Sequence, residues 1–204
     1  DLSGETSEGV SITIQLSASD VDGDNLTYSL LSDATNGSIT IEGQLATYVP
    51  TDYYYGADEF TFQVSDGELT DNASVSLFVN AVNDAPVLAT LDNVSFDEDS
   101  SEGVTLSATD IDGDDLTYSV TTGTDIVATL DGTDLSFTAP TDFNGTENFT
   151  VSVTDGDLTD SQVLTVTIVA VNDAPIAATD LSGETSEGVS ITIQLSASDV
   201  DGDN

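Results

Sequence analysis

The chain has 204 residues, 38% of them hydrophobic, and it carries 39 acidic side chains but no lysine, arginine or histidine. Because no internal cation can pair with a carboxylate, we expect the acids to repel one another until ions from solution neutralise them. The lack of basic residues argues against nucleic acid as a partner, and no apolar run long enough to insert into a membrane is present.

From the N-terminus onward, apolar and polar residues alternate with a period of two, which is typical of strands with one buried face. Clusters of Gly, Asp, Asn and Pro separate these runs, and about seven short strands in about 90 residues predict an immunoglobulin-like β-sandwich. After a lead-in segment near Glu8, the expected strands of the first domain are 12–18, 26–30, 38–41, 45–49, 60–64 and 74–82. We therefore expect an all-β chain of Greek-key sandwiches arranged end to end.

Internal repeats set the domain boundaries. DVDGDNLTYSL at 20–30 matches DIDGDDLTYSV at 110–120, and VNDAP occurs at 82–86 and again at 171–175. Residues 1–25 are identical to residues 180–204. These offsets predict one sandwich at 1–84, which lacks its first few residues, and a second at 85–173. The remainder, 174–204, is expected to be the N-terminal part of a third sandwich, in a chain that is an internal fragment of a longer array.

Acidic residues should gather where one sandwich meets the next. In a Greek-key sandwich the N-terminus and the turn after the first long strand lie at one end, and the C-terminus lies at the other. Oxygen ligands from two domains should therefore converge at the first junction: Asp58, Asn83, Asp84, Glu98, Asp110 and Asp112. Converging carboxylates need a hard cation, and Ca²⁺ accepts six to eight oxygen ligands in flexible geometry. Zn²⁺ and copper prefer His or Cys, which this chain lacks.

The same motifs carry a family resemblance. VNDAP, the A-x-D-x-D-G-D-x-L-T-Y-S block, the G-x-D/E-x-F segment and the V-S/T-D-G ending resemble bacterial cadherin-like tandem repeats, the immunoglobulin-like modules of large surface adhesins and extracellular fibres. The resemblance implies an extracellular or cell-surface location, neighbouring repeats as partners, and Ca²⁺ that stiffens the junctions. It implies a second junction made by Glu147, Asn172, Asp173, Glu187, Asp199 and Asp201. It also implies that Glu8, Asp20 and Asp22 face a preceding module.

Other interpretations stay open at this point. Asp-Gly sequences form turns without any metal, which is how we interpret Asp24 and Asp115. A glycan- or partner-binding adhesion module would use the aromatic side chains at 53–55 and Phe143. A halophile surface protein would use its acidity for solvation in brine. An enzyme is not expected, because without His, Cys and Lys only paired carboxylates could perform acid–base chemistry. In a variant of the array, segment 176–204 completes a neighbouring chain's sandwich by strand exchange.

Overall fold

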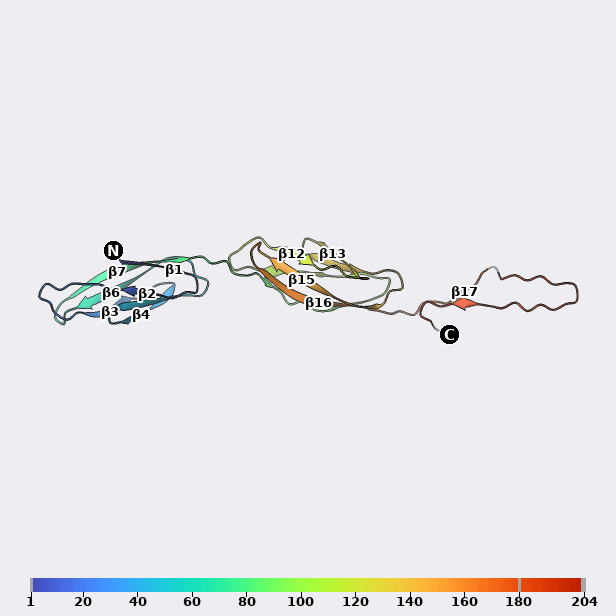
Figure 1. The fold of residues 1–204 in the computed structure, drawn as a ribbon, viewed down its shortest axis with the longest axis horizontal. Helices are drawn as coiled ribbons and strands as arrows, with labels where there is room; N and C mark the ends of the chain where they lie inside the picture. The colour runs from blue at the N-terminus through green and yellow to red at the C-terminus, as the bar shows by residue number, and fades with distance from the viewer. Residues whose placement is uncertain (1, 180, 203–204) are drawn as a thin grey trace. The chain divides into compact units, whose positions relative to one another are not determined.

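A computed structural model describes residues 2–179 and 181–202. Over these residues the chain consists of β-strands, turns and extended segments without a helix, so the all-β prediction is confirmed. This described part of the chain contains no helix long and apolar enough to span a membrane. The chain divides into two compact units, unit 1 (Asp1–Asp84) and unit 2 (Ala85–Asn204) (Figure 1).

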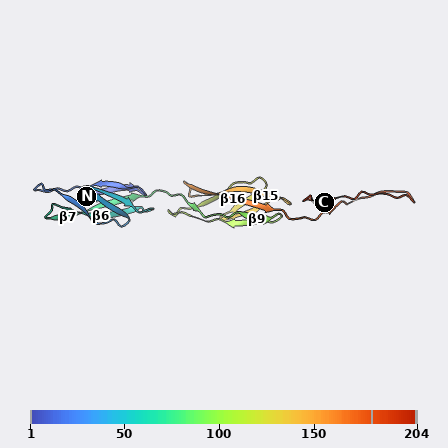
Figure 2. The same cartoon turned by 90° about the horizontal axis from the view of Figure 1, so that it is seen from below.

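Unit 1 is a sandwich of two sheets. The first sheet has the strand order β1-β7-β6-β3 and the second has the order β2-β5-β4. The strands are β1 (Leu2–Ser7), β2 (Ile12–Gln15), β3 (Thr27–Ser32), β4 (Gly37–Glu42), β5 (Leu45–Pro50), β6 (Gly56–Ser65) and β7 (Thr70–Asn80). Strand β1 runs parallel to β7, whereas all other pairs in this unit are antiparallel. Figure 2 shows the layers edge on, with β6 and β7 side by side.

The core of unit 1 lies between its two sheets. Phe60 and Phe62 of β6 and Val75 of β7 pack against Tyr48 of β5 and Ile14 of β2. Alternate residues of each strand are buried, as the period-two pattern predicts. The exact strand ends differ from the expected ones. The run expected at 74–82 begins earlier, at Thr70, because its first residues extend the hairpin with β6.

Unit 2 repeats this architecture. One sheet has the order β12-β15-β16-β9, with β9 parallel to β16, and a second has the order β10-β14-β13. Its strands are β9 (Val94–Asp97), β10 (Glu102–Thr105), β12 (Thr117–Val120), β13 (Val127–Asp131), β14 (Asp134–Thr138), β15 (Gly145–Thr154) and β16 (Thr159–Val169). Phe137 and Phe149 pack at 5.1 Å between ring centroids in its core.

Two short strand pairs complete unit 2. Strand β8 (Val87–Leu88) pairs with β11 (Ala108–Thr109), and Leu88 belongs to the sandwich core. Further along the chain, β17 (Ile176–Ala177) pairs in the same way with β18 (Ala197–Ser198). Between β17 and β18 the described residues contain no further strand, and their side chains are exposed.

Candidate metal centre

A glutamate holds the start of the linker in each unit. In unit 2 the backbone N–H of Val171 donates a 2.6 Å hydrogen bond to Oε1 of Glu98, a buried side chain. In unit 1 the N–H of Val82 donates to Oε2 of Glu8 at 3.2 Å. Both glutamates follow the parallel strand of their sandwich, so the strand order places each beside the outgoing linker. This differs from the expectation, which put Glu98 at the first junction and turned Glu8 toward a preceding module. Glu8 and Asp84 also line one cavity of about 230 Å³.

Three carboxylates meet at the linker of unit 2. Oxygens of Glu98, Asp173 and Asp201, which we call the linker cluster, all lie within 4.8 Å of one another. The N–H of Asp173 donates to Oδ2 of Asp201 at 2.6 Å. Burial, followed by the charges of nearby acids including Asp142, Asp201 and Glu98, raises the pKa of Asp173 above its usual value. The linker cluster thus concentrates negative charge that this chain cannot neutralise with a basic side chain.

A second group of acids forms within one turn. Oδ1 of Asp110 accepts hydrogen bonds from the N–H groups of Asp112, Gly113 and Asp114 at 2.9, 3.0 and 3.3 Å. Oxygens of the three acids, which we call the turn cluster, lie within 4.8 Å of one another. Burial, then the charges of Asp110 and Asp112, raises the pKa of Asp114.

The turn cluster contains a carboxylate oxygen that needs a partner. Oδ2 of Asp110 is buried and has no hydrogen-bond partner among the described residues. A buried oxygen of this kind costs free energy unless a donor or a cation satisfies it. Asp114 was not among the ligands expected from the sequence, although the D-x-D-x-D spacing from Asp110 points to it.

The corresponding turn of unit 1 has the same local geometry. Oδ1 of Asp20 accepts hydrogen bonds from the N–H groups of Asp22, Gly23 and Asp24, at 2.8, 2.7 and 3.0 Å. Each D-x-D-G-D sequence thus forms a turn held by its first aspartate, and the left-handed φ of 84° at Gly23 suits glycine. The turn and metal interpretations of these aspartates are therefore compatible, because the capping bonds use only the Oδ1 atom.

Asp58 and Glu147 differ from the expectation. The Asp58 carboxylate points into unit 1 and accepts hydrogen bonds from the N–H groups of Thr35 and Asn36 at 3.0 and 2.9 Å. Glu147 likewise accepts from Thr124 and Asp125, at 2.9 and 2.8 Å. Burial opposes ionisation of both side chains, but these N–H donors outweigh it and lower the pKa of each. The two carboxylates fix neighbouring loops, and we leave them out of the ion sites.

The remaining predicted ligands lie on the linkers and the last segment. The side-chain amides of Asn83 and Asn172 donate to the carbonyl oxygens of Asp84 and Asp173, at 3.4 and 2.9 Å. Oδ1 of Asp199 accepts from the N–H of Asp201 at 3.0 Å, which repeats the Asp110 turn. Glu187 is exposed and belongs to neither cluster.

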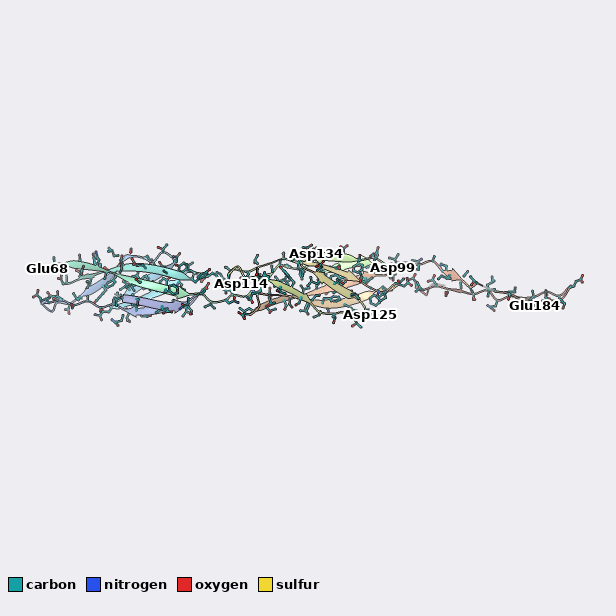
Figure 3. The ribbon with its side chains drawn as sticks, turned by 90° about the horizontal axis from the view of Figure 1, so that it is seen from above. Glu68, Asp99, Asp114, Asp125, Asp134 and Glu184 are labelled. Carbon is teal, nitrogen blue, oxygen red and sulfur yellow. The ribbon has the colours of Figure 1, made fainter. Side chains whose placement is uncertain are left out.

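The donor chemistry fits a hard divalent cation. Every candidate ligand is a carboxylate or amide oxygen, which Ca²⁺ prefers, and Oδ2 of Asp110 is a buried oxygen still to be satisfied. Other acids project from the surface and belong to none of the groups found among the described residues, such as Asp99, Asp125 and Asp134, which are labelled in Figure 3. Charge density alone therefore does not define the clusters. They arise where the linker and the turn bring carboxylates together.

Comparisons with known proteins identify the fold. Among solved structures, protocadherin gamma B2 extracellular cadherin domains 1–5 match 98% of this chain and 44% of that chain, with a TM-score of 0.60 and 19% sequence identity. That likeness shows the fold alone. Chitinase A of Pseudoalteromonas piscicida is 32% identical over 114 residues, which cover 54% of this chain. Integrin beta-like protein A of Dictyostelium discoideum is 29% identical over 244 residues, which cover 97% of this chain.

The match covers only 14% and 13% of the length of these two curated relatives. A family model described as a bacterial Ig domain matches residues 1–78 and 83–167, one match in each sandwich. Such domains are typically extracellular modules for adhesion or structure, and they are typically not enzymes. The resemblance to cadherin-like and immunoglobulin-like repeats is confirmed, and the chain belongs to the bacterial Ig domain family.

Proposed function

We propose that this chain is a structural segment of an extracellular tandem-repeat array, an adhesin stalk or a fibre, whose linkers Ca²⁺ stiffens. The observation that carries the proposal is the linker cluster, where Glu98, Asp173 and Asp201 approach within 4.8 Å with no basic side chain anywhere in the chain. Without a cation these charges repel and favour an open linker. Bound Ca²⁺ supplies positive charge and coordination sites that join a sandwich end, a linker and a turn.

The residues of the chain have distinct parts in this proposal. Glu98 orients the linker through its bond from the N–H of Val171, and Asp173 and Asp201 approach it from the linker and the following turn. By the sequence repeat, the counterparts of Glu98 and Asp173 at the preceding linker are Glu8 and Asp84, and we assign them the same role. Asn83 and Asn172 precede the linker aspartates and shape the backbone there.

The exposed side chains are also consistent with an adhesive or structural role. Tyr53 and Tyr55 are exposed, and the cavity beside Tyr53 is lined by acidic side chains of Glu8, Asp52 and Asp84. The match to chitinase A concerns 14% of that protein and brings no activity to this chain. The proposed partners are neighbouring repeats, with cell-surface glycans or other fibres as contacts of the whole array.

Thermal unfolding and hydrodynamic size test this proposal. The 204-residue chain is measured after chelation, with added CaCl₂, with MgCl₂, and with NaCl of equal ionic strength. We expect Ca²⁺ at micromolar to millimolar concentration to raise the melting temperature by mass action and to reduce the flexibility of the linkers. If NaCl has the same effect as CaCl₂, the acidity serves solvation in salt and the calcium proposal is wrong.

A further inference from the structure

A cavity of about 230 Å³ opens beside the linker of unit 1. The ring of Tyr53 and the apolar side chain of Val82 line it, together with three acids: Glu8, Asp52 and Asp84. The chain contains no lysine, arginine or histidine, so none of its own side chains can supply a cation to this cavity. A cation that enters it must therefore come from solution or from another molecule.

A turn holds Tyr53 at the surface. The N–H of Tyr54 donates to the carbonyl of Thr51 at 3.1 Å, and Tyr53, the third residue of this turn, has a left-handed φ of 61°. A turn with this φ at its third residue favours glycine or asparagine there, so the turn itself does not call for tyrosine. Tyr53 is 56% exposed, whereas Tyr54 packs against the core. The turn thus presents the ring of Tyr53 to the cavity and not to the core.

Unit 2 has acids at the corresponding positions. Asp142 is the third residue of the equivalent turn, with a φ of 58°, and its N–H donates to Oδ1 of Asp99 at 3.2 Å. By the sequence repeat, Asp99 is the counterpart of Gly9, which lines the cavity of unit 1. Unit 1 therefore has an aromatic ring and a residue without a side chain where unit 2 has two carboxylates. This difference gives the cavity of unit 1 a mixed aromatic and acidic character.

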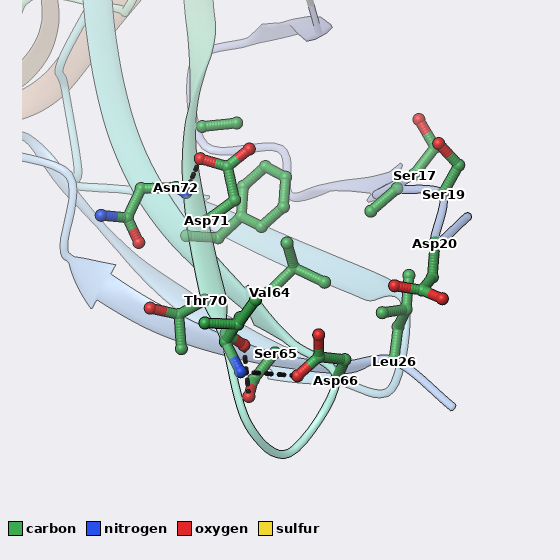
Figure 4. A pocket seen from close by; sticks show the side chains of 14 residues that line it. Ser17, Ser19, Asp20, Leu26, Val64, Ser65, Asp66, Thr70, Asp71 and Asn72 are labelled. Carbon is green, nitrogen blue, oxygen red and sulfur yellow. Dashed lines mark hydrogen bonds between the residues drawn. The ribbon is translucent and has the colours of Figure 1, made fainter. Parts of the chain in front are cut away.

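Another cavity of unit 1 contains acids without an exposed ring. Its volume is about 350 Å³, and Figure 4 shows three of the acids that line it, Asp20, Asp66 and Asp71. The aromatic residue that lines it is Phe62, which is only 2% exposed because its ring belongs to the core. The exposed ring therefore distinguishes the cavity at Tyr53 from this one, which can serve as a matched control.

A ring, carboxylates and an apolar wall together suit an organic cation. An ammonium or guanidinium group is attracted to the face of an aromatic ring within about 6 Å, and it donates strong hydrogen bonds to carboxylates. The alkyl stem behind such a group can lie against Val82, which is 46% exposed. Ca²⁺ would use the oxygen ligands but not the ring. The cavity is smaller than the about 300–1,000 Å³ of sites for drug-sized ligands, so it suits a group the size of a side chain.

We infer that the cavity at Tyr53 binds the cationic end of a lysine or arginine side chain from another protein. The apolar wall at Val82 favours these side chains over an amino sugar, because their charge lies at the end of an alkyl stem whereas an amino sugar carries its ammonium directly on the ring. Such binding goes beyond the proposed calcium-stiffened segment, because it concerns a partner protein. It uses two acids that we assign to the linker, Glu8 and Asp84, so Ca²⁺ and the side chain should compete.

NMR of the 204-residue chain with isotope-labelled tyrosine rings tests this binding. The chain is titrated in EDTA with butylammonium and ethylguanidinium, which copy the ends of lysine and arginine side chains, and with NaCl of equal ionic strength. We expect the organic cations, and not NaCl, to cause saturable shifts of the Tyr53 ring signals, which are identified by their loss in Tyr53→Leu. Neutral butanol should cause much smaller shifts, because it lacks the charge. Shifts that NaCl or butanol reproduces would overturn the inference.

Two pairs of variants separate the ring from the charge. With the N–H signal of Val82 as the probe, Tyr53→Leu should weaken binding about two- to five-fold, the scale of an exposed cation–π contact. Tyr55→Leu is its control, because Tyr55 is 54% exposed but does not line the cavity. Asp52→Asn should also weaken binding, whereas Asp71→Asn, in the cavity whose ring is buried, should not. Equal effects within either pair would contradict the inference.

Two further titrations distinguish this site from the calcium proposal and from a sugar site. If Ca²⁺ binds near Glu8 and Asp84, CaCl₂ should weaken binding of butylammonium more than NaCl of equal ionic strength does. If the calcium proposal is wrong, the two salts should act alike while binding in EDTA persists. Absence of binding in EDTA contradicts the inference, whatever calcium does. Tighter binding of glucosamine than of butylammonium would overturn the assignment to a protein side chain.

Discussion

The hydroxyl of Tyr48 donates a 3.1 Å hydrogen bond to Oδ2 of Asp58 inside unit 1. The same carboxylate accepts backbone N–H groups of Thr35, Asn36 and Glu59. Burial and this bond raise the pKa of Tyr48, while the backbone donors outweigh the burial of Asp58 and lower its pKa. A chain without basic residues thus keeps one buried carboxylate ionised with neutral donors alone.

Asp58→Asn should destabilise unit 1 by about 1–3 kcal/mol, because an amide offers fewer acceptor sites to four donors and leaves some of them unsatisfied. Urea unfolding followed by circular dichroism measures the change. Tyr48→Phe removes one donor and should cost about 1 kcal/mol. Asp52→Asn, on an exposed turn, is the control. If Asp58→Asn behaves like Asp52→Asn, the internal role of Asp58 is wrong.

Stability should fall in acid partly through Asp58. Its pKa is lower in the folded chain than the unfolded value of about 3.9, so its contribution is complete above that value. The contribution is lost as the pH falls through the lowered folded pKa. Unfolding free energy measured from pH 5 to pH 2 should therefore decline less steeply in Asp58→Asn than in the unmodified chain. Parallel curves for the two proteins would show that Asp58 is not the group that titrates.

We expect the effect of a linker-cluster substitution on stability to change sign when calcium is added. Asp173→Asn removes one of three crowded charges, so after chelation the variant should be at least as stable as the unmodified chain. With CaCl₂ the order should reverse, because an oxygen ligand with full charge is lost. We expect the apparent calcium affinity to fall at least about ten-fold, on the scale known for groups that support metal sites.

Calcium titrations followed by thermal unfolding check this reversal. Asp125→Asn, an exposed acid outside both clusters, removes the same charge and serves as the control. An equal loss of affinity in Asp125→Asn would mean that overall charge, and not the cluster, governs binding.

Asp110→Asn tests the turn cluster in the same assay. The amide can still accept the bonds that close the turn through Oδ1, but it loses the charge at the buried Oδ2 atom. We expect little change in the fold after chelation and a weaker response to calcium. Asp115→Asn, the adjacent acid outside the cluster, is the matched control. A large loss of stability without calcium would instead assign Asp110 a purely structural role.

The period-two pattern predicts the sandwiches well, because one buried face per strand fixes which side chains enter the core. The same pattern could have placed Asp58 and Glu147 correctly. Asp58 shares a face with Phe60 and Phe62 in β6, and Glu147 shares one with Phe149, so both point inward. Because both residues lie near a turn in the sequence, we expected their side chains to point outward to a junction. The geometry of the turn, by contrast, could not be derived from residue spacing alone. That geometry decides which carboxylate oxygen of Asp110 accepts the backbone N–H bonds and which oxygen remains for another partner.

The identity of residues 1–25 and 180–204 was also visible in the sequence, but its consequence was not. Leu16 is buried in a core that it shares with residues of β5 and β7, such as Tyr48 and Val75, which lie far along the chain from it. The copy at Leu195 has no such strands among the described residues and is exposed. Local sequence therefore specifies the strand, and the surrounding sandwich decides whether its apolar side chains are buried.

Gly37 offers a separate test of the Tyr48–Asp58 pair. A Cβ atom at this position would overlap the ring of Tyr48 and lie 2.6 Å from the carbonyl oxygen of Val49. Gly37→Ala should therefore displace the ring, weaken its bond to Asp58, and destabilise unit 1 by about 1–3 kcal/mol. Ser38→Ala, on the exposed face of the same strand, should change stability by less than about 0.5 kcal/mol.

Tyrosine titration distinguishes a specific effect from general loosening. Tyr48 has a raised pKa, so in the folded chain it should ionise at a higher pH than a free tyrosine side chain. In Gly37→Ala under folding conditions its pKa should fall toward the ordinary value of about 10, because burial and the bond to Asp58 both weaken. A variant that loses stability but keeps the late-titrating tyrosine would show that the strain spreads through β4 and β5 without reaching the Tyr48–Asp58 bond.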